Sequence, residues 1–346
     1  MSKLTALTSC CLVYLFGCAP STGGEPSDEG WDQLDIGKGD GSSASSYGAL
    51  ALATVPAQLE VVRVGLELVD DDVLPHETKQ LRKEIGKLRD FVDLFAFAYK
   101  PGKHGDKWKD VRDELDVGYE TMGHFKDLFD VQDVVDPTDA VYDEDEVAEL
   151  RDELRGWSDV YAASEHQQEL SAYLGAPSST KLHDRPKDDQ PRFYWQEAGL
   201  EPDAKLSGLK NLARLQRELL DEASRDLADV PEIGKLTKAS NAVAFHDFRK
   251  RVRSIEKLAT YFPQMTKPND SEQAAELLEV IIEAVDRYGT LNDQIVRFER
   301  AKDDDDDDRA DELEDAIDEE FEVLIEWQED VDLDEVLEDL RSTVRK

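Results

Sequence analysis

Cysteine is nearly absent from this chain of 346 residues: it occurs three times, at positions 10, 11 and 18. If the chain is cleaved at Cys18, no pair of cysteines remains that could form a disulfide, and catalytic thiols and cysteine metal sites are excluded from the rest of the chain. Positive charge is scarce too, with 41 Lys and Arg against 80 Asp and Glu and a formal net charge of -39. That balance disfavours a long nucleic acid duplex as a partner.

A long apolar segment is missing as well. The apolar stretch LTALTSCCLVYLF near the N-terminus has about 13 residues, whereas a membrane-spanning helix needs about 20. Preceded by Lys3 and ending in LFGC, it is typical of an export signal over residues 1–17. The ending resembles the lipobox of bacterial lipoproteins, which implies lipidation of Cys18; an ordinary secretory signal is the alternative. We expect a lipid-anchored protein of the cell envelope, and Ala19 is compatible with the outer membrane of a Gram-negative cell.

Apolar periodicity is lacking in the segment 18–55, which is rich in Gly, Ser and Asp, so we expect a flexible tether there. The other end is acidic: residues 303–346 hold 22 acidic and 4 basic residues, a net of -18. The hexa-aspartate that opens it differs from an EF-hand loop, because Asp308 stands where the turn needs glycine. After the hexa-aspartate, apolar residues recur at spacings of three and four residues. We therefore expect 301–346 to be an acidic helical tail that packs back on the domain and is dispensable for its folding.

Strand patterns are scarce between these ends, and apolar residues recur at helical spacing in segment after segment. The pattern predicts an all-α fold. The stretch 178–203 is rich in Pro, Asp and Ser and breaks the helical pattern, so we expect it to link two halves, 56–177 and 204–300.

Two segments run against the acidic bias of the chain. Residues 76–90 hold five Lys or Arg against three acids, and residues 246–260 hold five against two. In each segment a histidine is followed by basic residues at offsets of 3, 7 and 11, which share one narrow face of a helix: His76, Lys79, Lys83 and Lys87 in the first, and His246, Arg249, Arg253 and Lys257 in the second. Such a face is often merely solvated. Like charges on one helix face repel, however, so an anionic ligand is the more economical explanation.

Each basic segment is followed by a short glycine element, MGHFKD after the first and YGTLND after the second. The chain over roughly 56–300 thereby resembles the CHAD domain, a histidine-containing α-helical family. The resemblance implies two pseudo-symmetric helical bundles whose basic helices face a shared groove for inorganic polyphosphate. It implies as contacts the following residues: His76, Lys79, Arg82, Lys83, Lys87, His246, Arg249, Lys250, Arg253 and Lys257.

We expect a binding module for polyphosphate or a similar phosphate-rich polyanion, with no cofactor, no metal and no catalytic residues. An enzyme is disfavoured, since no spacing selects carboxylates that would converge on a catalytic metal. Nucleic acid is disfavoured also because no aromatic residues interleave with either basic stripe. The alternative function is a structural or partner-binding acidic lipoprotein that keeps the scaffold without binding a polyanion.

Overall fold

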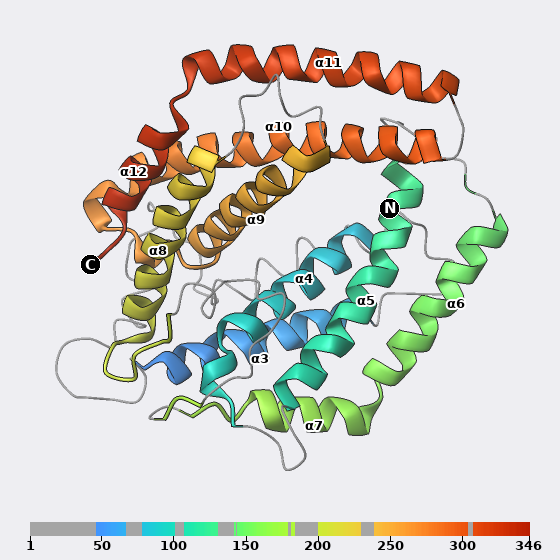
Figure 1. Cartoon of the computed structure of the whole chain (residues 1–346). Helices are drawn as coiled ribbons and strands as arrows, with labels where there is room; N and C mark the ends of the chain where they lie inside the picture. The colour runs from blue at the N-terminus through green and yellow to red at the C-terminus, as the bar shows by residue number, and fades with distance from the viewer. Residues whose placement is uncertain are drawn as a thin grey trace, which may run out of the picture. The chain divides into compact units, whose positions relative to one another are not determined.

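The computed structural model describes residues 46–66, 78–100, 107–130, 142, 144–178, 181–183, 200–229, 239–303 and 307–346. Over these ranges it contains ten α-helices and no β-strand (Figure 1), which confirms the predicted all-α fold. The chain divides into two compact units, residues 1–193 with 202–208 and residues 194–201 with 209–346. The division at 193 falls inside the stretch that we expected to link two halves.

The first unit contains five α-helices in its described part. They are α3 (Tyr47–Leu66), α4 (Lys79–Leu94), α5 (Lys107–Asp130), α6 (Glu144–Tyr161) and α7 (Ser164–Leu174). In Figure 1, α3 and α4 lie side by side, and α6 lies along the outer side of α5. The 3-10 turn η3 (Ala96–Ala98) follows α4 and is fully buried.

Helix α3 begins nine residues before the expected start of the domain at residue 56. Tyr47, Ala51 and Val55 are buried, and the Tyr47 hydroxyl donates to the carbonyl oxygen of Leu94. The predicted tether 18–55 is therefore too long at its C-terminal end, because a helical spacing of small apolar residues was not recognised there. In the described part of the chain, α3 alone is long and apolar enough to span a membrane, but its buried face is typical of a core helix.

The second unit is built from the helices that follow. They are α8 (Gly208–Asp229), α9 (Ala239–Tyr261), α10 (Ser271–Asp303), α11 (Asp307–Asp330) and α12 (Leu333–Thr343). Helix α11 runs along α10 (Figure 1) and buries Leu313, Ile317, Phe321 and Leu324. The segment 301–346 is thus part of the second unit and packs back on it, as its apolar spacing predicted. Its buried residues argue against the expectation that it is dispensable for folding.

Buried residues follow the same spacing on the second and third helices of both units. On α4 and α9, each with the residue that follows it, the two sets are Leu81, Ile85, Leu88 and Phe95, and Phe248, Val252, Ile255 and Phe262. On α5 and α10 they are Trp108, Leu115, Met122 and Phe125, and Ala274, Ile281, Tyr288 and Leu291. The helix pairs α4–α5 and α9–α10 therefore bury the same faces.

The chain also ends each unit with a similar backbone contact. After α7, the Ser178 amide donates to the carbonyl oxygen of Ala98, 2.7 Å away in the turn that follows α4. After α12, the Arg345 amide donates to the carbonyl oxygen of Met265, 2.8 Å away in the turn that follows α9. In both units the segment after the fifth helix closes on the turn after the second.

Candidate functional site

The basic face of α4 consists of Lys79, Arg82, Lys83 and Lys87. Lys79 and Lys83 are exposed, and Arg82 and Lys87 are half-buried. The opposite side of the helix is buried at Leu81, Ile85 and Leu88, as the periodicity predicted, so the core orients the basic face outward. His76, which was expected to open this face, lies outside the described residues.

The nearest carboxylate on α4 does not neutralise this face. The Glu84 carboxylate accepts hydrogen bonds from two amides, Nε2 of Gln80 at 2.6 Å and Nε2 of Gln58 at 2.9 Å. Gln58 of α3 also donates to the Glu84 carbonyl oxygen at 3.0 Å. The hydrogen-bond partners of Glu84, which follows Lys83 in the chain, are therefore neutral amides. Lys79 and Lys83 form no ion pair with any residue that the structure describes.

Arg82 is held against the neighbouring helix α5. Its guanidinium carbon lies 4.0 Å from the ring centroid of Tyr119, and its Nε donates to the Tyr119 carbonyl oxygen at 3.3 Å. A Cβ at Gly86 would lie 3.0 Å from the Tyr119 ring, so this glycine lets the ring pack close to α4. A glycine inside a helix costs about 1 kcal/mol relative to alanine. At Gly86 this cost is linked to the close packing of the Tyr119 ring, which contacts Arg82.

The basic face of α9 consists of Arg249, Lys250, Arg253 and Lys257. Lys250 and Arg253 are exposed, and Arg249 and Lys257 are half-buried. Neither Lys250 nor Arg253 forms an ion pair with a described residue. His246 lies within α9, but its side chain is outside the described part, so its expected role stays a prediction.

The contacts of Arg82 and Arg249 align the two basic helices differently from an alignment that matches His76 with His246. Arg82 lies against Gly123 of α5, and Arg249 lies against Gly289 of α10. With Arg82 matched to Arg249, KQLRK at 79–83 corresponds to HDFRK at 246–250, and Lys79 rather than His76 corresponds to His246. Core spacing and the two glycines fix this register, whereas matching the histidines shifts it by three residues.

One acid, Glu256, lies within the basic face of α9 between Arg253 and Lys257. Burial raises the pKa of Glu256, and Asp286 on α10 adds to the rise, while Arg253 and Lys257 oppose it. The fold therefore disfavours the negative charge at this position, which reduces its ability to neutralise the adjacent cations.

Two further arginines of the first unit are buried in a charge network that the sequence did not reveal. Arg89 pairs with Asp116, and Arg112 Nε lies 3.8 Å from a carboxylate oxygen of Asp93 and 3.9 Å from one of Asp116. The Arg89 side chain is only 8% exposed, and its guanidinium carbon also lies 4.0 Å from the Tyr119 ring centroid. These arginines join α4 to α5 and are structural, since buried cations need partners. The sequence offered no signal for them beyond their acidic neighbours at helical spacing.

A second polar cluster of the first unit links α5 to α7. His166 Nε2 lies 2.9 Å from a carboxylate oxygen of Glu114, and the edge of the His166 ring packs against Tyr161. Burial raises the pKa of Glu114, and the imidazole of His166 opposes the rise. A shallow surface depression adjoins this pair, lined by acidic residues of α6 and α7. No group of three or more side chains suited to a metal ion occurs in the described ranges.

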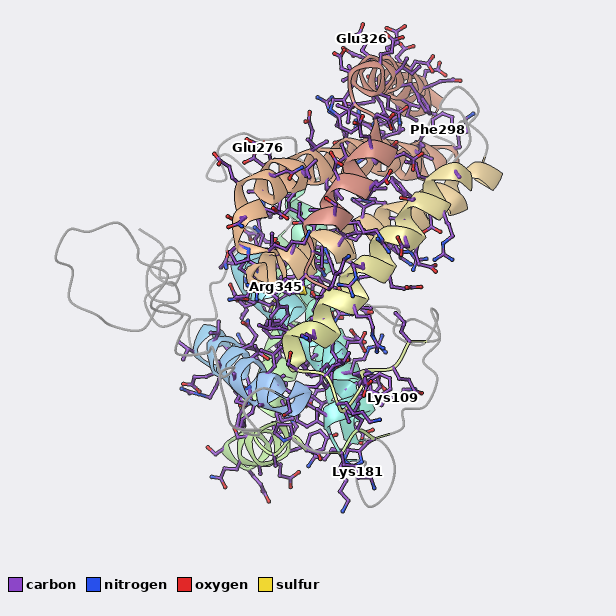
Figure 2. The ribbon with its side chains drawn as sticks, turned by 90° about the vertical axis from the view of Figure 1, so that its left-hand side faces the viewer. Lys109, Lys181, Glu276, Phe298, Glu326 and Arg345 are labelled. Carbon is purple, nitrogen blue, oxygen red and sulfur yellow. The ribbon has the colours of Figure 1, made fainter. Side chains whose placement is uncertain are left out.

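Figure 2 shows how the acidic side chains of α11 are disposed. Glu326 lies on the side of α11 that faces away from α10, whereas Leu313, Ile317 and Phe321 are buried. Acidic residues are therefore concentrated on the solvent side of this helix. The exposed face of α11 is thus acidic, whereas the exposed faces of α4 and α9 are basic.

The comparisons with known proteins gave no match: no family model fits the chain, and neither a curated protein nor a solved structure is similar to it.

Proposed function

We propose that this chain is a lipid-anchored, non-enzymatic binding module of the cell envelope that holds inorganic polyphosphate or a similar phosphate-rich polyanion. The contacts are the basic faces of α4 and α9. Histidines 76 and 246 are included as orienting donors, and Cys18 carries the lipid.

The observation that carries the proposal is that five cations of these faces make no ion pair within the described part of the chain. Five other surface arginines, Arg63, Arg155, Arg225, Arg287 and Arg309, each pair with an acid of their own helix at 2.6 to 3.5 Å. Lys79, Arg82, Lys83, Lys250 and Arg253 make no ion pair with a described residue, in a chain with 80 acids. Cations that stay unneutralised in so acidic a protein are suited to an external anion.

The surrounding negative charge does not prevent such binding. At about 0.15 M salt the Debye length is about 8 Å, so acids on other surfaces act only weakly on a phosphate at these faces. The immediate acids are restrained locally, Glu84 by two amides and Glu256 by burial.

The resemblance to the CHAD family belongs to the same proposal. Two units with the same order of helices, the same spacing of buried residues and one glycine-seated arginine each support descent from a duplicated helical unit. That both basic faces line one groove stays a prediction.

The test is a calorimetric titration of the purified soluble chain, without its signal segment, with long-chain sodium polyphosphate. Reversal of Lys83→Glu and Arg253→Glu together should abolish binding at low salt while circular dichroism and the melting temperature stay close to the wild type, because both side chains are exposed.

The matched control reverses two exposed cations outside the basic faces, Lys109→Glu on α5 (Figure 2) and Arg297→Glu on α10. It changes the net charge equally and should retain most of the affinity. Equal binding by both double variants, or no binding by the wild type, would remove the function and leave the scaffold.

A further inference from the structure

Two arginines, one in each unit, lie against a glycine of the following helix. A Cβ at Gly289 of α10 would lie 2.7 Å from a terminal nitrogen of Arg249, and 3.3 Å from its guanidinium carbon. A Cβ at Gly123 of α5 would lie 3.4 Å from a terminal nitrogen of Arg82. Both glycines are buried, whereas the glycine of α6, Gly156, is exposed and faces open space.

Gly289 restrains the position of the Arg249 guanidinium group, because a Cβ there would displace it, whereas a Cβ at Gly123 would meet Arg82 at ordinary contact distance. Arginine loses much side-chain freedom when its planar group is pressed against a helix backbone, and a restrained planar group loses less entropy when it binds an oxyanion. Arg82 is restrained twice, by the Tyr119 ring and by its Nε hydrogen bond to the Tyr119 carbonyl oxygen. Its two terminal nitrogens make no hydrogen bond with a described residue. Nε of Arg82 is thus used by the Tyr119 carbonyl oxygen, and the two terminal nitrogens of Arg82 can donate to a ligand.

The other cations of the two faces lack such restraint. Lys79, Lys83, Lys250 and Arg253 are exposed, and their side chains make no hydrogen bond or ion pair with a described residue. A flexible ammonium group attracts a polyanion as a point charge, whereas a fixed guanidinium group can bind two oxygens of one phosphate.

We infer that Arg82 and Arg249 are the specificity-determining residues of the basic faces of α4 and α9. Tyr119 holds Arg82 and close packing on Gly289 holds Arg249, so that each guanidinium plane takes two oxygens of one phosphate group, while the exposed lysines supply unoriented charge. This inference rests on the proposed function.

The first experiment keeps the charge and removes the planar group. Arg82→Lys and Arg249→Lys together should weaken binding of long-chain sodium polyphosphate by about tenfold, since a charge-assisted hydrogen bond contributes on that order. Arg297→Lys is the matched control: it makes the same change at an exposed arginine of α10 outside the basic faces, and should bind as the wild type. The salt slope of log K should hardly change in either variant, because the number of charges is constant.

The second experiment moves one guanidinium group without touching it. Gly289→Ala should displace Arg249, whose far end can shift at little cost to the fold, and should lower affinity severalfold. Gly123→Ala places its Cβ at ordinary contact distance from Arg82 and should leave affinity unchanged. Gly156→Ala, with nothing near it, controls for the higher helix propensity of alanine.

The outcomes separate the inference from the proposed function. If the wild type binds polyphosphate and the double lysine variant binds as tightly as Arg297→Lys, both arginines only pack the helices and the inference is wrong. Equal affinities for Gly289→Ala and Gly123→Ala would also overturn it, and this pair stays informative if the double lysine variant fails to fold. A wild type that does not bind at low salt removes the function and the inference with it.

Discussion

At the residue scale, Glu256 is an acid within the basic face of α9, and its burial affects both its pKa and the stability of the fold. For an acid whose pKa is raised in the folded state, the favourable contribution is present below its unfolded pKa of about 4.3 and is lost as the pH rises through the folded value. Burial is the main cause of the rise at Glu256, so its ionised form at neutral pH opposes folding. The acid is tolerated because Arg253 and Lys257 offset part of that penalty.

We therefore predict that Glu256→Gln stabilises the protein at pH 7 and has little effect at pH 4, where the wild-type carboxyl is largely protonated. The same variant should tighten polyphosphate binding at pH 7, because it removes a negative charge between Arg253 and Lys257. Urea unfolding at the two pH values and a calorimetric titration measure the two effects.

Glu279→Gln on α10 is the control, since this exposed acid changes the net charge equally. Its stability should be close to the wild type at both pH values. A Glu256→Gln variant that is less stable than the wild type at pH 7 would show that the carboxylate holds Arg253 and Lys257 in place.

At the scale of elements, periodicity predicted the helices and the packing of the acidic segment on the domain, while its charge led to the expectation that it is dispensable for folding. The apolar spacing of Leu313, Ile317 and Phe321 was recognised, but the excess of acids suggested an appended tail. An amphipathic helix with one acidic face satisfies both patterns, and only its packing on α10 decides between them. The start of α3 was missed for the opposite reason, because small residues such as Ala51 give a weak apolar signal.

The site was predictable in part for a similar reason. Exposure of Lys79, Lys83, Lys250 and Arg253 follows from their position opposite the buried residues of the same helix. The packing of Arg82 near Gly123 and of Arg249 against Gly289 could not be predicted, since it depends on which residues of the neighbouring helix lie beside each arginine. Arg89 was counted among the basic residues of 76–90 but not among the expected contacts, and the structure buries it beside Asp116.

Deletion of residues 304–346 tests the role of α11 and α12 in folding. It removes the buried side chains of both helices, Leu313, Ile317, Phe321, Leu324, Leu333, Leu337, Leu340 and Val344, and the ion pair of Arg341 with Asp221. Truncating a single buried leucine costs about 2 to 5 kcal/mol, and a domain has about 5 to 15 kcal/mol in total. We predict loss of cooperative unfolding in the second unit, followed by thermal circular dichroism and tryptophan fluorescence.

Neutralising exposed acids of α11, Glu322→Gln with Glu326→Gln, is the matching control. It lowers the charge of the segment without opening the core, so the melting temperature should stay within a few degrees of the wild type. A truncated chain that keeps its helicity per residue and its cooperative transition would restore the description of the segment as a tail.

At the scale of the whole molecule, the position of the chain in the cell depends on its first segment. We predict that Cys18 is lipidated and becomes the mature N-terminus, because it ends the apolar run in LFGC. Mass spectrometry of the membrane fraction should find an acylated N-terminal peptide. Cys18→Ser should abolish acylation and Cys11→Ser should leave it intact; a soluble mature chain with another N-terminus would exclude the lipid anchor.

Salt dependence distinguishes a site built from point charges from one built by shape alone. Single-stranded polyanions lose about 0.7 units of log K per decade of salt for each phosphate that is neutralised, so about six contacts predict a slope near -4 for polyphosphate, by analogy with nucleic acid. Lys83→Ala should make that slope shallower by about 0.7 because it removes one contact, whereas Lys109→Ala, also exposed and outside the basic faces, should leave it unchanged. Fluorescence anisotropy with labelled polyphosphate at several salt concentrations gives both slopes from the same preparation. A wild-type slope near zero would mean that the basic faces of α4 and α9 do not contact the polymer, since a protein of net charge -39 has no other source of so steep a dependence than local phosphate neutralisation.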